Sequence, residues 1–227
     1  MVDEGAAGHR ERLRERFAQG GIDSLLDYEI LELLLTFVNA RGDTKPLAKR
    51  LLAEFKSLGG VLNAGADKLQ TVDGVGPRTA VLMAFLRDMA AYCLRERVQS
   101  RSAISHRRSV EEYLRFEFGH RADEFVAVLF LNTANAVLSA EVVAEGTVNQ
   151  CVIYPREIVQ KALQLGAASM ILAHNHPAGT PHPSEADWSM TGRLHEVGRL
   201  LDLPLVDHLV VCRDQVQSLR ELPRWPR

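Results

Sequence analysis

Two histidines that lie two residues apart, with a carboxylate shortly after them, form a ligand set for a divalent metal ion. His174 and His176 follow the apolar run 169–173, which predicts a short buried strand. Residues i and i+2 of a strand point to the same face, so both imidazoles can reach one ion. Asp187 supplies a third ligand. Three protein ligands leave the fourth tetrahedral position to water, which is typical of a catalytic zinc site and points to a hydrolase.

The position of Ser184 predicts that Asp187 lies in the first turn of a helix, from which its carboxylate can reach the ion. It follows Pro183 and precedes Asp187 by three residues, which is the spacing of an N-cap residue and the first turn of a helix. The same pair also fits an ordinary capping box with no metal nearby. The loop 177–183 contains three prolines and a glycine, so it excludes a long helix or strand. A rigid turn between two ligands and a third favours the metal site over packing alone.

The elements that must position these residues predict an α/β domain over residues 109–227. The continuous apolar run 125–131 is typical of a central strand, and Ser109 with Glu112 predicts a capped helix that begins at Val110. Strands that alternate with helices are typical of the α/β class. The expected strands are 125–131, 137–144, 169–173 and 205–212, and the expected helices are 110–118, 155–166 and 184–201.

Residues 1–98 predict an all-α bundle, because apolar residues recur at helical spacing between short loops. The pair Gly59-Gly60 predicts an interruption after the third helix. Residues 99–108 are polar, basic and without periodicity, which predicts a linker. The expected helices of the bundle are 9–17, 25–37, 46–55 and 79–97.

A glycine turn at residues 72–80 joins two of the predicted helices and looks like a helix-hairpin-helix. Gly74 and Gly76 leave backbone N–H groups free at a helix start, where a phosphate can bind, and Arg78 adds a positive charge. Such hairpins often bind the DNA backbone without sequence specificity. The alternative is a tight structural turn. It is favoured by the balance of 14 Lys+Arg and 14 Asp+Glu over residues 1–98.

Composition limits the classes of partner. The 227 residues carry a net charge of −2, so no polybasic signal over the whole chain indicates nucleic acid or an anionic membrane. The three cysteines are scattered and odd in number, which suits a reducing compartment. No apolar run reaches the length of a membrane span. These features predict a cytoplasmic protein without membrane contact.

The ligand spacing resembles a known motif. His-x-His, seven residues, Ser, two residues and Asp is the metal motif of the JAMM (JAB1/MPN+) metalloenzymes. With its flanks, the chain resembles the bacterial RadC family, in which a JAMM domain follows a helical N-terminal region. The resemblance implies an all-α helix-hairpin-helix bundle followed by a cytidine deaminase-like α/β domain with a mixed sheet. The flanking motifs are Tyr154-Pro155-Arg156-Glu157, Ile171-Leu172-Ala173 with Pro177, and Val206-Asp207-His208.

The resemblance also implies roles for individual residues. His174, His176 and Asp187 would bind one Zn²⁺ per chain, and Ser184 would support the oxyanion of the reacting carbonyl. In JAMM enzymes a glutamate between a helix and the following strand moves the proton. Glu124 occupies the matching position, directly before the strand 125–131.

Three other side chains keep two interpretations each. Glu141, inside the second expected strand, is either the rival proton carrier or an outward-facing strand residue. His208 is either a partner of a metal ligand or a core histidine at a strand end. His182 lies in the loop before Ser184 and either approaches the metal or is a solvated loop histidine, which is the simpler interpretation.

Three functions follow from these expectations. The first is a zinc-dependent hydrolase of a peptide or isopeptide bond in a peptide or protein substrate, acting near DNA through the N-terminal domain. The second, which the RadC resemblance implies, is a DNA repair or recombination accessory whose metal is not catalytic. The third is a metal-dependent nuclease. It fits less well, because one zinc with a proton-carrying glutamate suits acyl chemistry better.

Overall fold

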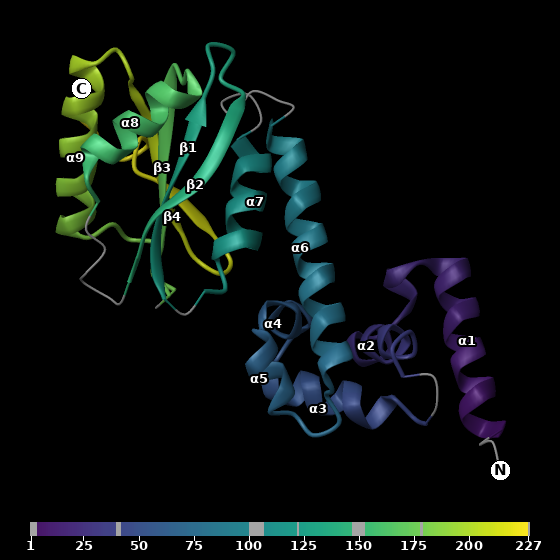
Figure 1. The fold of residues 1–227 in the computed structure, drawn as a ribbon. Helices are drawn as coiled ribbons and strands as arrows, with labels where there is room; N and C mark the ends of the chain where they lie inside the picture. The colour runs from purple at the N-terminus through teal and green to yellow at the C-terminus, as the bar shows by residue number, and fades with distance from the viewer. Residues whose placement is uncertain are drawn as a thin grey trace. The chain divides into compact units, whose positions relative to one another are not determined.

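The computed structural model describes residues 4–39, 42–99, 107–121, 123–146, 153–177 and 179–226 (Figure 1). The chain divides into two compact units, Met1–Ala90 and Ala91–Arg227. The division falls inside the long helix α6 (Pro77–Gln99). Most of the linker expected at residues 99–108 lies outside the described residues.

The first unit is helical, as predicted. Its core is made of aliphatic side chains from several helices, including Leu35, Leu51, Val61 and Met83, which are fully buried. The finer prediction of a helix-hairpin-helix stays a prediction. The elements of this unit are α1 (Glu4–Gly20), the 3₁₀ helix η1 (Ile22–Ser24), α2 (Asp27–Leu35), α3 (Lys45–Phe55), α4 (Leu58–Asn63), α5 (Ala66–Gln70) and the first part of α6.

The interruption expected at Gly59-Gly60 is wrong, because both glycines lie inside α4. Ser57 caps this helix by accepting a hydrogen bond from Gly60 N at 3.0 Å. A Cβ atom at position 60 would lie 2.0 Å from the carbonyl oxygen of Phe55. Glycine therefore serves here as the residue that lets α4 approach the end of α3, and it does not break the helix.

The second unit is an α/β fold around a mixed five-stranded sheet, as predicted. The strand order is β2-β1-β3-β4-β5, with β3 and β4 parallel and the other neighbours antiparallel. The likeness to cytidine deaminases stays a prediction. Its elements after α6 are α7 (Arg107–Phe118), β1 (Glu124–Leu131), β2 (Val137–Gly146), α8 (Pro155–Leu165), β3 (Ser169–Asn175), α9 (Glu185–Leu200), β4 (Leu205–Val211) and β5 (Val216–Ser218).

Helices cover both faces of this sheet. On one face α7 packs against β1, where Phe118 stacks on Phe125 with ring centroids 3.9 Å apart. On the other face α8 and α9 supply Ile158 and Leu194, which pack against Val128. Figure 1 shows α7 on one side of the strands and α8 with α9 on the other. Because both faces are covered, β1 reads as a continuous apolar run.

The start of α7 differs from the expectation. The helix begins at Arg107, so Ser109 lies within it and is not the N-cap of a helix that begins at Val110. Glu112, expected to complete a capping box, instead pairs with Arg108 at 3.3 Å. Glu111 pairs with Arg107 at 2.6 Å in the same i,i+4 spacing. Both ion pairs favour extension of the helix toward its N-terminus.

None of the helices in the described ranges is long and apolar enough to cross a membrane.

Candidate metal centre

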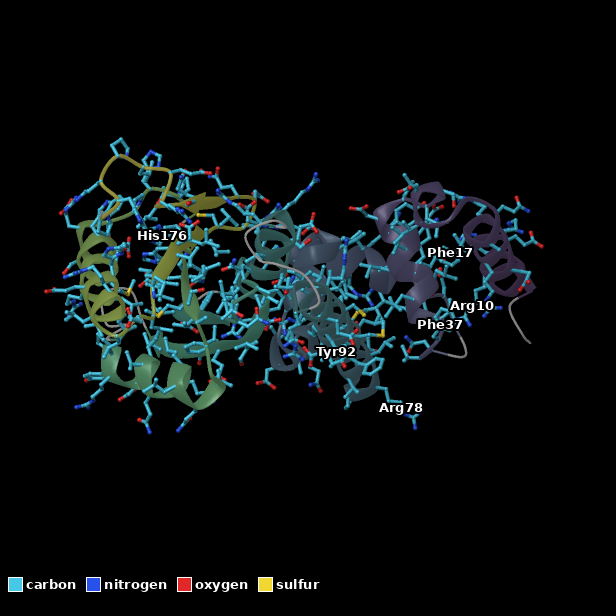
Figure 2. The ribbon with its side chains drawn as sticks, turned by 90° about the horizontal axis from the view of Figure 1, so that it is seen from above. Arg10, Phe17, Phe37, Arg78, Tyr92 and His176 are labelled. Atoms are coloured by element: carbon cyan, nitrogen blue, oxygen red, sulfur yellow. The ribbon has the colours of Figure 1, made fainter. Side chains whose placement is uncertain are left out.

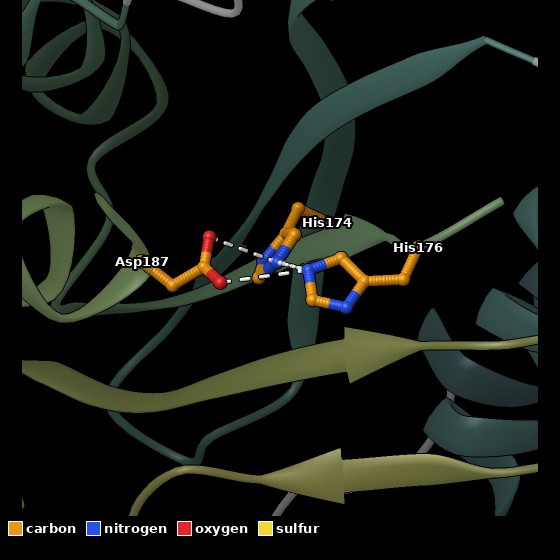
Figure 3. A group of neighbouring side chains, drawn as sticks. All are labelled: His174, His176 and Asp187. Carbon is orange, nitrogen blue, oxygen red and sulfur yellow. Dashed lines mark hydrogen bonds and ion pairs between the residues drawn. The ribbon is translucent and has the colours of Figure 1, made fainter. Parts of the chain in front are cut away.

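A strand, a loop and a helix bring the three predicted ligands together at the carboxyl end of β3. His174 lies in β3 and His176 directly after it, where His176 N donates to Val211 O of β4 at 2.9 Å. Ser184 is the N-cap of α9, and Asp187 is the third residue of that helix. Because α9 covers the sheet face on which His174 lies, its first turn faces both imidazoles (Figure 3).

The donor atoms of these residues converge on one point. The two Nε2 atoms lie 2.9 Å apart, and the Asp187 oxygens lie 3.1 Å from Nε2 of His174 and 3.4 Å from Nε2 of His176. A tetrahedral zinc ion with ligands at 2.0–2.1 Å holds neighbouring ligand atoms about 3.3 Å apart. The three residues therefore fit a tetrahedral metal ion. No other group of three metal-binding side chains comes together in the described part of the chain.

The charges at the site suit a cation. Burial raises the pKa of Asp187, but hydrogen bonds from His174 and His176 outweigh it and hold the pKa far below its ordinary range. The hydrogen bond with Asp187 in turn raises the pKa of His176, and the charge of Glu124 adds to this increase. An ionised carboxylate is thus held between two imidazoles in a largely buried position.

Both imidazoles turn their second nitrogen away from the convergence point. His176 Nδ1 lies 2.7 Å from the carbonyl oxygen of Thr180. His174 Nδ1 lies 2.7 Å from Nε2 of His208, whose Nδ1 lies 2.6 Å from the hydroxyl of Thr191. His208 is fully buried, and burial lowers its pKa well below the ordinary value. His208 had two interpretations, a partner of a metal ligand or a core histidine. The structure places it in contact with His174, a predicted ligand.

Asn175, the residue between the two histidines, holds β1 against β3. Its Oδ1 accepts from Phe125 N at 2.9 Å, and its Nδ2 donates to Asp123 O at 3.1 Å. The side chain is buried on the sheet face opposite to that of the histidines, as alternation along a strand requires. The His-x-His spacing predicts no role for Asn175. Nothing in the local pattern reveals partners that are about fifty residues earlier in the chain.

Glu124 is the first residue of β1 and is half-buried. In the antiparallel pairing of β1 with β3, Val126 lies opposite His174. Two residues further along each strand, Glu124 is opposite His176 on the same face of the sheet. The effect of its charge on the pKa of His176 agrees with this placement. The structure therefore sets the predicted proton carrier beside the ligands.

Glu141 lies elsewhere on this face. It pairs with Val128, four residues along β1 from Glu124, or about 13 Å at the rise of a strand. Its carboxylate accepts from Lys161 Nζ and from Ser139 Oγ, each at 3.0 Å. The rival carboxylate is thus engaged in an ion pair with α8.

Ser184 contacts Asp187 at three points. Its hydroxyl donates to Asp187 Oδ2 at 2.7 Å and accepts from Asp187 N at 3.2 Å, and Ser184 N donates to the same Oδ2 at 2.6 Å. The capping box predicted from the sequence is therefore present, and it orients the carboxylate toward the histidines. His182, in the preceding loop, is exposed.

The glycine turn of the helical unit lies at residues 71–76, between α5 and α6. Gly74 has φ +92°, a left-handed conformation that favours glycine. Arg50 donates from Nε and Nη2 to Asp73 O at 3.2 and 3.0 Å and so holds the turn. Gly76 and Arg78 are exposed, and the Arg78 side chain extends outward from α6 (Figure 2). The phosphate-binding role of this turn stays a prediction.

A family model described as a RadC-like JAB domain matches residues 104–224, a range that includes the His-His-Asp group. A second model, described as UPF0758 N-terminal, matches residues 7–81. The chain therefore belongs to the UPF0758 family with a RadC-like JAB domain, as the resemblance to RadC predicted.

Relatives are similar along almost the whole chain. A UPF0758 protein of Fusobacterium nucleatum is 36% identical over 97% of this chain and 98% of its own. The UPF0758 protein of Rhodobacter capsulatus is 41% identical, over 92% and 97%. One from Ruegeria pomeroyi is 40% identical, over 93% and 95%. Both units thus have counterparts in these proteins.

Proposed function

We propose that the α/β unit is a zinc-dependent hydrolase that cleaves a peptide or isopeptide bond. The observation that carries this proposal is the convergence of His174, His176 and Asp187 at distances that fit a tetrahedral ion, with Glu124 on the same face. Membership in a family with a JAB domain supports it. Three ligands leave a fourth position for the reacting molecule.

Each residue has a defined task. His174, His176 and Asp187 hold the ion, which when bound supplies Lewis acidity that polarises a carbonyl and lowers the pKa of a water to about 7. The carboxylate of Glu124 accepts the proton of the attacking water and passes it to the departing nitrogen. Asn175 keeps Glu124 in place, because it ties the first residues of β1 to the end of β3.

Ser184 completes the proposed machinery as the donor to the oxyanion. Its hydroxyl hydrogen is directed to Asp187 Oδ2. Donation to the substrate requires the hydroxyl to rotate toward the carbonyl oxygen, where a positioned donor stabilises the developing charge. Ser184→Thr keeps both the cap and the hydroxyl, so it is the matched control for Ser184→Ala.

Metal analysis tests the site. The purified chain should contain about one zinc, the stoichiometry of a single three-ligand site. His174→Ala and Asp187→Asn should lose it. His182→Ala, which removes an exposed histidine from the same loop region, should keep it. A wild-type chain that neither contains nor binds zinc would contradict the proposal.

Cleavage assays with peptide and isopeptide libraries test the chemistry. Glu124→Gln should reduce the rate by about 10²–10⁴-fold, the usual contribution of acid–base catalysis. Glu141→Gln is the matched control, because Glu141 lies on the same face but pairs with Lys161. Cleavage that survives Glu124→Gln and is lost in Glu141→Gln would overturn the assignment of the proton carrier.

A second candidate function is supported by the glycine turn of the helical unit. We propose it as a contact to the DNA backbone, since Arg78 is exposed beside free N–H groups at the start of α6. A protein that binds DNA and zinc but cleaves no peptide or isopeptide would be the repair or recombination accessory. Cleavage of DNA that depends on His174 would instead indicate a nuclease.

Salt-dependent DNA binding by the full chain tests this second function. Arg78→Glu should weaken binding and lower the slope of log K against log salt by about one phosphate contact. Arg193→Glu, an exposed arginine of α9, is the matched control for net charge. Equal binding by the two variants, or no binding at low salt, would leave the hairpin a structural turn.

A further inference from the structure

We propose that Thr191 and His208 are positioning residues that keep a hydrogen on Nδ1 of His174, so that its Nε2 can offer a lone pair to a metal ion in place of its contact with Asp187. Neither residue is a ligand. The inference rests on the proposed function in one respect, namely that a metal binds at His174. It concerns the buried chain of hydrogen bonds from His174 through His208 and Thr191 to the backbone of Asp187.

The other histidine ligand needs no such chain. His176 Nδ1 lies 2.7 Å from Thr180 O. A carbonyl oxygen can only accept, so the His176 ring carries a hydrogen on Nδ1, and its Nε2 can offer a lone pair when a metal ion replaces the contact with Asp187. One contact therefore sets the tautomer of His176 in the form that a metal requires.

His174 is different because its partner is another imidazole. A ring nitrogen of a neutral histidine either donates or accepts. If His208 carried its hydrogen on Nε2, that nitrogen would donate to His174 Nδ1. The hydrogen of His174 would then be on Nε2, in the position of the metal. The contact between the two rings permits both arrangements, and only one of them leaves a ligand.

Thr191 selects between them. Its Oγ1 lies 2.6 Å from Asp187 O, which can only accept, so the one hydroxyl hydrogen is directed there. The same Oγ1 lies 2.6 Å from His208 Nδ1 and must accept from it. His208 therefore carries its hydrogen on Nδ1, and its Nε2 accepts from His174 Nδ1 at 2.7 Å.

Burial prevents water from changing which ring nitrogen carries the hydrogen. Thr191 and His208 are each 0% exposed and His174 is 6% exposed, so bulk water does not substitute for a missing partner. The series of hydrogen bonds also returns to the first turn of α9, because its final acceptor is the backbone oxygen of Asp187. One set of hydrogen bonds thus joins two ligands that lie thirteen residues apart. Partners of this kind contribute about 10–100-fold to metal affinity.

The ring nitrogens of His208 provide a direct test in the metal-free chain. Long-range ¹H–¹⁵N spectra of histidine-labelled protein, recorded at a pH where the ring is neutral, should show its hydrogen on Nδ1. Thr191→Val, which removes the hydroxyl, should add a population with the hydrogen on Nε2. A hydrogen on Nε2 in the wild type contradicts the inference, as does an unchanged ring in the variant. A residue that served only packing would leave the tautomer unaltered.

Affinity for Zn²⁺ alone, measured by competition with a chromophoric chelator, provides the second test. Thr191→Val should lose about 10–100-fold and Thr191→Ser should restore the affinity. Thr36→Val is the matched control, because buried Thr36 donates to Leu33 O at 2.6 Å in the other unit. Unchanged affinity in Thr191→Val, or an equal loss in Thr191→Ser, contradicts the inference.

The two tests separate this inference from the proposed function. A wild-type chain that binds no zinc contradicts the proposed function, while the His208 spectrum still decides whether Thr191 sets the tautomer. A chain that binds zinc with the same affinity in wild type and Thr191→Val contradicts the positioning role alone. If Thr191→Val does not fold, the wild-type spectrum and Thr191→Ser still decide.

Discussion

Buried polar side chains have different partners in the two units. In the helical unit the buried side chains of Glu29, Glu32, Thr36 and Thr44 bond to helix ends, to carbonyl oxygens or to one basic side chain of another helix. Glu29 accepts from Leu26 N at 3.0 Å and from Arg16 at 2.9 and 3.0 Å. Thr36 and Thr44 donate to helix carbonyls at 2.6 and 3.2 Å. These bonds hold helix ends and neighbouring helices in place and do not meet at a common point.

In the α/β unit four of the buried polar side chains lie in one connected hydrogen-bond network. His174, His208, Thr191 and Asp187 form one connected set, and Ser184 joins it through Asp187. Three potential metal-ligand atoms, one each from His174, His176 and Asp187, lie close together in this region. Polar groups that satisfy backbone atoms indicate scaffold, whereas groups that satisfy each other around a shared point indicate a site.

The largest expected effect is on zinc affinity, and it comes from removal of one of the three predicted ligands. Asp187→Asn should lower zinc affinity by more than the about 10–100-fold that loss of an outer partner costs. Glu29→Gln is its counterpart in the helical unit and should leave zinc affinity unchanged. Chelator competition measures both. Equal effects of the two substitutions would remove the distinction between the units.

Asn175→Ala should have the next largest effect. It leaves Phe125 N–H buried without its acceptor, which costs about 1–3 kcal/mol of unfolding free energy, as measured by urea denaturation. Loss of the clamp should also displace Glu124, and a misplacement of about 1 Å can cost about 10²-fold in rate. Asn63→Ala, which removes a half-buried bond to Gly59 O, is the control and should cost less than about 1 kcal/mol. If both variants kept the wild-type rate, Asn175 would not position the proton carrier.

Glu29→Gln should cost about 1 kcal/mol near neutral pH, since a charged acceptor of Arg16 is replaced by a neutral one. The hydrogen bond from Arg16 lowers the pKa of Glu29 below its ordinary value near 4.5. Its stabilisation is therefore present above pH 4.5 and is lost as the pH falls through the lower pKa of the folded state. Urea denaturation from pH 3 to 7 should show the two proteins converging at the acid end. A gap that widens toward low pH would contradict the sign of this shift.

The smallest effect is expected for Lys161→Ala. Lys161 and Glu141 form an ion pair at 3.0 Å on the same sheet face as the site, with side chains 39% and 33% exposed. Exposed pairs of this kind contribute about 0–1 kcal/mol, so thermal denaturation should change little. Zinc affinity should stay at the wild-type value. A clear loss of affinity would extend the site along β1 and bring Glu141 back as a participant.

The local part of the candidate site is readable from the sequence. His174 and His176 share a strand face, and Ser184 with Asp187 follows the rules of helix N-termini. Each of these predictions depends on neighbours within a few residues. The same holds for the central strand 125–131, whose apolar run indicates cover on both faces.

The rest of the site depends on partners that are distant in the chain. His208 lies 34 residues after His174, and Asn175 bonds to the start of β1 some fifty residues before it. Thr191 had a usable signal, since it lies one helical turn after Asp187 and therefore on the same face of α9. Its role became visible only with the partner from β4 in place.

The errors in the fold have a local cause. Ser57 caps α4 so that Gly60 lies inside the helix, and the nearby carbonyl of Phe55 explains why this residue is glycine. Ser109 follows a helix start that the Arg107–Glu111 pair favours. In both cases a contact between residues three or four positions apart favours a helix start that the glycine pair and the serine did not predict.

The tripeptide at the end of β3 gives the protein an unusual sensitivity to length. His174 and His176 serve one face of the sheet while Asn175 serves the other. Insertion of a single residue before His174 would exchange the two faces: one amide would point toward the metal position, and two imidazoles would enter the layer beneath α7. A register shift of one position would thus remove the predicted metal ligands from their face of the sheet and bury polar side chains under α7. A substitution at one of the three positions would remove one of these roles, whereas a change in the number of residues would remove all of them at once.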